Sequence, residues 1–259
     1  MIIPLQKPYF CAAMQTQNTN EWFASWFDSP YYHLLYCNRD EHEAADFLTL
    51  LTAHLRLPKT NHLLDLACGA GRHSRVLHSL GYRVTGCDLS PNSIREAQEK
   101  AAEGMDFFVH DMRNPLPGNY DTVLNLFTSF GYFDNVQDNA KVLNSVFNAL
   151  NENGLLVIDF MNAEKVIREL KMRQEINRDG ILFHIKREVS NGKIVKTIAF
   201  EVEGKSHFYQ EKVQALDLID FQQLLGNAGF EIVETFGNYA LESFSPLLSD
   251  RLILICKKR

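Results

Sequence analysis

The chain has 259 residues, 46% hydrophobic and 22% charged, which suits a globular protein with a substantial buried core. Its formal net charge is −6, and no segment concentrates lysine and arginine. Because phosphate backbones are bound by clustered basic residues, this balance argues against nucleic acid as a substrate. The length fits one large α/β domain, or a core domain that carries a smaller insertion.

The cysteines and the first residues argue against several other protein classes. The five cysteines are scattered and show no C-x-x-C spacing, so neither a disulfide framework nor a zinc site is expected. Residues 1–10 have neither a basic start nor a long apolar run, so no signal peptide or transmembrane helix is expected. We therefore expect a cytoplasmic protein with reduced thiols, no metal and no membrane contact.

Two helical segments are predicted in residues 1–58. Aromatic residues at helical spacing predict the first over 20–28, and it ends near Ser29-Pro30. One apolar face predicts the second from about Asp40 to Leu55. The pattern changes after this second segment.

Residues 59–173 alternate short apolar runs with helical patterns. Most of the runs are separated by a predicted helix; they are 62–66, 82–87, 107–109, 121–126 and 155–160. This alternation predicts a doubly wound α/β fold, in which a mostly parallel sheet is covered on both faces.

Residues 174–215 break this alternation. Asn191-Gly192 lies between two strand patterns, and Asn-Gly in that position is the strongest short hairpin signal. The predicted strands are 181–189, 193–202 and 205–213. We interpret 174–215 as an antiparallel β insertion in a core made of residues 59–173 and 216–259. A helix at 217–227 and strands at 230–236 and 251–257 complete this core.

The first apolar run leads into a turn of small residues, from Asp65 to Gly71. A strand that turns sharply into a helix here presents free backbone N–H groups to a ligand. A dinucleotide site usually reads G-x-G-x-x-G, but Ser74 occupies the place of the third glycine. Asp65 also ends the strand, and its carboxylate would repel a pyrophosphate but suits a ligand with an ammonium and a sulfonium.

With this motif the chain resembles the class I S-adenosylmethionine-dependent methyltransferases. Their first motif reads acid-x-Gly-x-Gly-x-Gly, and here Ala67 replaces the first glycine, which leaves Gly69 and Gly71. The resemblance is clear over roughly residues 40–160. It implies a seven-stranded Rossmann-like sheet, S-adenosylmethionine as the methyl donor and S-adenosylhomocysteine as the product.

Two further acids follow the second and third strand patterns, and they continue the resemblance. Asp65, Asp88 and Asp111 are spaced 23 residues apart, about one βα unit each. Because parallel strands end at one edge of the sheet, the three acids should meet there. The resemblance implies that Asp88 binds the ribose hydroxyls and Asp111 accepts the adenine amino hydrogen. It also implies that Leu89 and Met112 contact the adenine ring.

The resemblance implies further cofactor contacts. Asn125, Leu126 and Phe127, after the fourth strand, would line the methionine moiety. Relatives that act on small molecules close an N-terminal helix with tyrosines over the cofactor, which assigns residues 1–58 as a cover. The remaining candidate contacts are Arg72, Tyr32, Tyr36 and Arg39. No catalytic base is evident, and the candidates are Tyr32, Tyr132, His184 and His207.

We expect methyl transfer by direct displacement to a nitrogen, oxygen or carbon nucleophile of a small molecule. Relatives with an antiparallel insertion methylate amino sugars and glycine-type amines, and some pair through this sheet. Residues 174–215 would therefore form an acceptor roof or a dimer contact, in a monomer or homodimer. The alternatives are a non-catalytic S-adenosylmethionine-binding partner subunit and a methyltransferase for protein or RNA, which the acidic balance opposes. Ser74 and Asp65 argue against a nicotinamide oxidoreductase.

Overall fold

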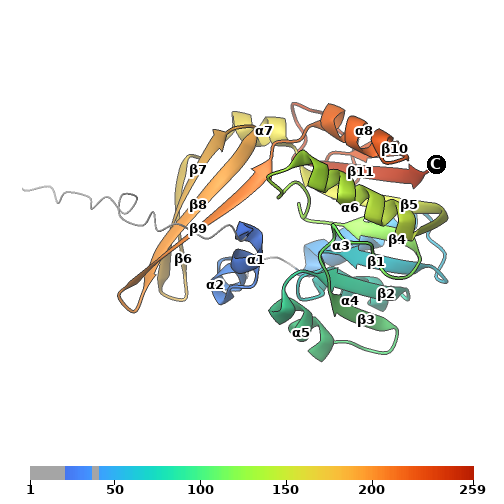
Figure 1. Cartoon of the computed structure of the whole chain (residues 1–259), viewed down its shortest axis with the longest axis horizontal. Helices are drawn as coiled ribbons and strands as arrows, with labels where there is room; N and C mark the ends of the chain where they lie inside the picture. Colours follow the sequence, from blue (N-terminus) through green and yellow to red (C-terminus); the bar gives the residue numbers. More distant parts are fainter. Residues whose placement is uncertain (1–20, 37–40) are drawn as a thin grey trace, which may run out of the picture.

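A computed structural model describes residues 21–36 and 41–259. Its centre is a seven-stranded sheet in the order β10-β11-β5-β4-β1-β2-β3 (Figure 1). Five strands run parallel: β1 (His62–Leu66), β2 (Arg83–Asp88), β3 (Met105–Val109), β4 (Tyr120–Asn125) and β5 (Leu150–Met161). The antiparallel pair β10 (Phe230–Phe236) and β11 (Arg251–Lys258) extends the sheet beyond β5. The predicted doubly wound fold is confirmed.

Helices cover both faces of this sheet because successive strand residues point to opposite sides. Leu63 and Val157 pack with α3 (Glu41–His54) and α4 (Arg72–Ser79). Leu64 and Ile158 pack with α6 (Val136–Ala149) and α8 (Leu218–Asn227) on the other face. The remaining helix of the parallel region, α5 (Pro91–Glu99), contacts β2 and β3.

Two short helices precede α3. The Ser29 hydroxyl accepts a hydrogen bond from the backbone N–H of Tyr31 and begins α2 (Pro30–Leu35), immediately after α1 (Trp22–Phe27). These two helices lie between the core and a second sheet (Figure 1), and α1 contacts the last strand of that sheet. No helix within the described ranges is long and apolar enough to cross a membrane.

The second sheet is antiparallel and has four strands in sequence order. It follows the short helix α7 (Ala163–Arg168) and consists of β6 (Arg173–Arg178), β7 (Ile181–Ser190), β8 (Lys193–Val202) and β9 (Lys205–Gln214). The Asn191-Gly192 turn joins β7 and β8 with both residues at positive φ, as its sequence predicted.

The largest differences from the sequence predictions are at β6 and β5. The sequence did not predict β6, because its residues are mostly polar and exposed and show no apolar alternation. Strand β5 begins at Leu150, five residues earlier than expected, with a register irregularity opposite Tyr120 and Thr122. Asn153 lies within this early part at a φ of +61°, which explains its turn-like sequence.

Candidate active site

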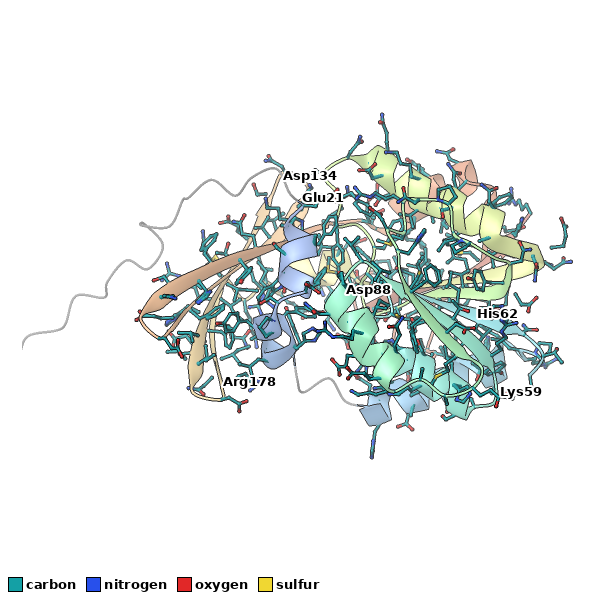
Figure 2. The ribbon with its side chains drawn as sticks, turned by 60° about the horizontal axis from the view of Figure 1, so that its bottom comes forward. Glu21, Lys59, His62, Asp88, Asp134 and Arg178 are labelled. Carbon is teal, nitrogen blue, oxygen red and sulfur yellow. The ribbon has the colours of Figure 1, made fainter. Side chains whose placement is uncertain are left out.

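A cavity of about 350 Å³ lies at the carboxyl edge of the parallel strands. Asp88 lies at this edge, toward α1 and α2, whereas Lys59 and His62 lie at the opposite end of the sheet (Figure 2). Segments after β1, β2, β3 and β4 all reach the cavity. The sequence-predicted residues on its wall are Tyr32, Tyr36, Ala67, Gly69, Arg72, Asp88, Leu89, Asp111, Met112, Leu126, Phe127 and Tyr132.

The two glycines of the first turn have different surroundings. Both have left-handed backbones, with φ of +54° at Gly69 and +75° at Gly71. A Cβ added at Gly69 would meet nothing within 4 Å, and Gly69 lines the cavity. A Cβ at Gly71 would lie 3.0 Å from the Phe107 ring and 3.2 Å from Ala97. Gly69 therefore leaves the cavity open, whereas Gly71 allows α5 and β3 to pack beneath the turn.

Asp88 joins the first two strand ends. Its carboxylate accepts hydrogen bonds from the backbone N–H groups of Gly69, at 2.8 Å, and Ser90, at 2.9 Å. Burial raises the pKa of Asp88, and these N–H groups partly oppose the increase. The carboxylate thus sets the shape of two loops of the cavity wall at once.

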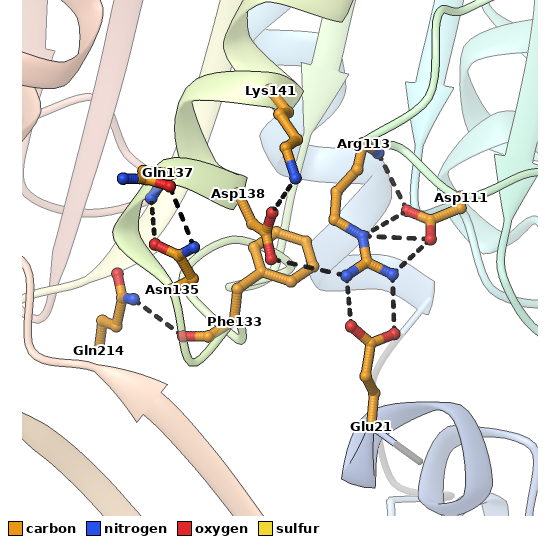
Figure 3. Close-up of polar contacts among 9 residues, drawn as sticks. All are labelled: Glu21, Asp111, Arg113, Phe133, Asn135, Gln137, Asp138, Lys141 and Gln214. Carbon is orange, nitrogen blue, oxygen red and sulfur yellow. Dashed lines mark hydrogen bonds and ion pairs between the residues drawn. The ribbon is translucent and has the colours of Figure 1, made fainter. Parts of the chain in front are cut away.

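Asp111 is held by an arginine that the sequence analysis did not single out. Arg113 donates from Nε to Asp111 Oδ1 at 3.0 Å and from Nη2 to Glu21 Oε2 at 2.7 Å (Figure 3). Burial acts to raise the pKa of Asp111, but the hydrogen bonds from Arg113 outweigh it and hold the pKa below its usual value. Glu21 is the N-cap residue of α1, so Arg113 ties the N-terminal helices to the third strand end.

Asp65, Gly71 and Asn125 support the wall from behind and do not line the cavity. Asp65 is buried, and the Ser74 hydroxyl donates to its Oδ2 at 2.6 Å. Burial raises the pKa of Asp65 to about 6. Asn125 donates to the carbonyl of Leu66 at 3.1 Å. Ser74, which stands where a dinucleotide motif has glycine, therefore fastens α4 to the first strand.

The methyltransferase domain family matches residues 58–223. The chain belongs to this family. The protein YqeM of Bacillus subtilis (strain 168) is 27% identical over 213 residues, which cover 78% of this chain and 86% of that protein. A glycine/sarcosine N-methyltransferase of Parasynechococcus marenigrum (strain WH8102) is 26% identical over 224 residues, 80% of this chain and 75% of that one.

A solved structure shares the fold. The S-adenosylmethionine-dependent methyltransferase of Clostridium acetobutylicum ATCC 824 has a TM-score of 0.74 at 19% identity and covers 88% of this chain and 96% of that one. The predicted family is confirmed, and the chain is an S-adenosylmethionine-dependent methyltransferase.

The loop after β4 of this methyltransferase depends on a buried acid. Phe127 and Thr128 have φ of +59° and +61°, a strained conformation for branched and aromatic residues. Asp159 holds both: its Oδ2 accepts from the Phe127 N–H at 3.0 Å, and its carbonyl accepts from the Thr128 N–H at 2.9 Å. Asp159 is completely buried and pairs with Arg251 at 2.7 Å. The sequence signal that could have identified Asp159 is its position as a single acid within an apolar strand.

The N-terminal helices of the methyltransferase supply an aromatic wall. Phe23 and Phe27 of α1 line the cavity together with Tyr32 and Tyr36, although the sequence analysis named only the two tyrosines. The rings of Phe27 and Tyr132 are 5.2 Å apart, and the Tyr132 hydroxyl donates to the Thr128 carbonyl. The aromatic cluster therefore joins α1 to the loop after β4.

The remaining candidates lie elsewhere. His184 pairs with Glu175 at 3.0 Å on the second sheet, and the His207 ring stacks 4.9 Å from that of Phe200. Neither histidine lines the cavity. Arg39 lies outside the described residues. The described part of the chain contains no group of three or more His, Cys, Asp and Glu residues arranged to hold a metal ion.

Proposed function

We propose that the cavity binds S-adenosylmethionine and that the methyltransferase moves its methyl group to a small-molecule nucleophile by direct displacement. The observation that carries this proposal is the convergence of the glycine turn, Asp88 and Asp111 on one cavity at the carboxyl edge. In open α/β sheets this edge is where ligands bind.

The residues of the cavity fit the donor. The open space at Gly69 allows the backbone to approach a ligand closely. Asp88 would hold the ribose hydroxyls. Asp111 and Met112 would hold the adenine, with Leu89 against its ring, and Arg72 would bind the carboxylate of the methionine end. Arg72 lines the cavity, and its guanidinium lies 4.4 Å from the centre of the Phe127 ring.

Bound S-adenosylmethionine supplies a methyl group that its sulfonium already activates. The chain then contributes alignment and exclusion of water, for which Phe27, Tyr32 and Tyr132 form the wall. Tyr32 and Tyr132 remain the candidates for contact with the acceptor, since His184 and His207 lie off the cavity. The Parasynechococcus relative is named for methyl transfer to nitrogen, so amines are the first acceptors to test.

Calorimetric titration with S-adenosylhomocysteine tests the cofactor assignment. Asp88→Ala should weaken binding by about 1.5–3 kcal/mol, the usual cost of losing hydrogen bonds to a charged group. Asp106→Ala is the matched control, because Asp106 is exposed on β3 and pairs only loosely with Arg83, at 3.8 Å. Equal affinities of wild type and a folded Asp88→Ala variant would contradict the ribose assignment.

A further inference from the structure

A second cavity, of about 280 Å³, adjoins the first. Five aromatic residues line both cavities: Phe27, Tyr32, Tyr36, Phe127 and Tyr132. Residues of β7, β8 and β9 line only the second cavity, as do Met161, Val166 and Arg251. The two cavities therefore meet at these five aromatic side chains.

We propose that the second cavity binds the methyl acceptor, and that Arg187 on β7 recognises an anionic group of that acceptor. The inference rests on the proposed function, because it takes the first cavity as the donor site. It adds the chemical class of the acceptor: a small amine that carries a carboxylate or a phosphate.

The charges around the second cavity carry this inference. Its wall contains three cationic side chains, Arg187, Lys196 and Arg251. Arg251 pairs with the buried carboxylate of Asp159 at 2.7 Å, and Lys196 lies 3.6 Å from Glu211. Two of the three cations are thus matched by an acid.

Arg187 has a different environment. It donates to the carbonyl of Lys171 at 3.3 Å and to the side-chain oxygen of Gln174 at 2.9 Å, and both acceptors are neutral. Within the described ranges, no carboxylate lies within ion-pair distance of Arg187. Glu211 on the wall and the buried Asp159 thus neutralise two of the three cations, and the charge of Arg187 remains.

The one acid on this wall is already engaged. Glu211 Oε1 accepts from Trp26 Nε1 at 2.8 Å and from the Tyr36 hydroxyl at 2.6 Å, while its Oε2 faces Lys196. A cationic acceptor would have to displace these partners, whereas an anion meets the half-buried guanidinium of Arg187 directly. The planar fork of arginine matches the two oxygens of a carboxylate or phosphate.

Three matched amines test the inference by calorimetry on the complex with S-adenosylhomocysteine: glycine, aminomethylphosphonate and glycinamide. At least one of the two amines with an anionic group should bind the wild type more tightly than glycinamide, which lacks an anionic group. Arg187→Gln should weaken that binding at least about tenfold, and Arg187→Lys, which keeps the charge, should weaken it less. The better of the two anionic probes identifies the carboxylate or the phosphate class.

Lys186→Gln is the matched control. It removes the same charge from the neighbouring residue of β7, which points to the opposite face and pairs with Glu188 at 2.6 Å. An equal loss in Lys186→Gln and Arg187→Gln would overturn the inference, because it would indicate a general charge effect. Failure of both anionic amines to bind the wild-type complex would also overturn it.

The affinity for S-adenosylhomocysteine separates the two proposals. It should be the same in Arg187→Gln and wild type, because Arg187 does not line the first cavity. If the wild type does not bind S-adenosylhomocysteine at all, both proposals are overturned. Retained S-adenosylhomocysteine binding with no response to Arg187→Gln would overturn only the acceptor site.

Discussion

The two cavities are built in different ways. The first is formed mainly by short segments that directly follow β1 to β4, and its carboxylate Asp88 binds backbone N–H groups of two of those segments. The second is assembled from α1, α2, the loop after β4, the end of β5, α7, three strands of the second sheet and β11. It is held by side-chain pairs such as Trp26 with Glu211, which are 185 residues apart. Local backbone shape thus defines most of the first cavity, and long-range side-chain contacts define the second.

This contrast predicts that backbone substitutions damage the first cavity most. Gly69→Val should weaken S-adenosylhomocysteine binding by at least about 100-fold, because a branched residue is strained at φ +54° and its side chain would enter the open space. Titration calorimetry measures the loss.

A glycine of the second sheet provides the control for this substitution. Gly192 also has a positive φ, +70°, and an added Cβ there meets nothing within 4 Å. Gly192→Val should therefore incur comparable strain while binding S-adenosylhomocysteine like the wild type. If both variants lose binding equally, global destabilisation explains the effect and the turn is not a ligand contact.

An intermediate loss of cofactor affinity is expected at Arg113, which joins α1 to Asp111 at the end of the third strand. Arg113→Gln should weaken S-adenosylhomocysteine binding about tenfold, or about 1.4 kcal/mol, because it releases α1 from Asp111. It should also raise the KM of the acceptor, since α1 lines both cavities. Lys100→Gln, which breaks only the exposed pair with Glu96, is the control. A change in acceptor KM without any change in cofactor affinity would contradict the link through Asp111.

The smallest change in cofactor affinity is expected at Asp65. This acid lies behind the wall, so Asp65→Asn should change S-adenosylhomocysteine affinity by less than about threefold. Stability should respond instead. The folded pKa of about 6 exceeds the ordinary value of 3.8, so the charged carboxylate destabilises the folded state. This cost is fully present above pH 6, declines as pH falls and is absent below pH 4.

Urea unfolding of Asp65→Asn and wild type at several pH values tests whether the charged Asp65 carboxylate destabilises the folded state. The variant should be more stable by roughly 1–3 kcal/mol at pH 8, and the difference should shrink toward pH 4. Asp106→Asn, an exposed change on β3, should show no such trend. A stability difference that stays constant from pH 8 to pH 4 would contradict burial as the cause.

The sequence by itself determined the parallel core and the segments at the strand ends that line the first cavity. The strands and helices of the core are predictable because their apolar patterns involve only residues that are close in sequence. The same holds for the left-handed turns at Gly69 and Asn191-Gly192. The 23-residue spacing of Asp65, Asp88 and Asp111 placed one acid at each strand end. In the structure, however, Asp65 lies behind the wall, because Ser74 of α4 donates to it from the buried side.

Only the tertiary structure decided which distant residues complete the sites. Arg113 meets Glu21 and Arg251 meets Asp159, and in each pair the residues are 92 positions apart. Arg251 reaches Asp159 because β11 pairs antiparallel with β5, a neighbourhood that no local pattern encodes. The strand β6 was missed for a related reason: its polar residues form a strand through pairing with β7, not through an apolar face of their own. The spacing of apolar residues predicts single helices and strands, because it depends on residues that are close in sequence. The second cavity depends instead on which strands and helices pack together, and local spacing does not determine that.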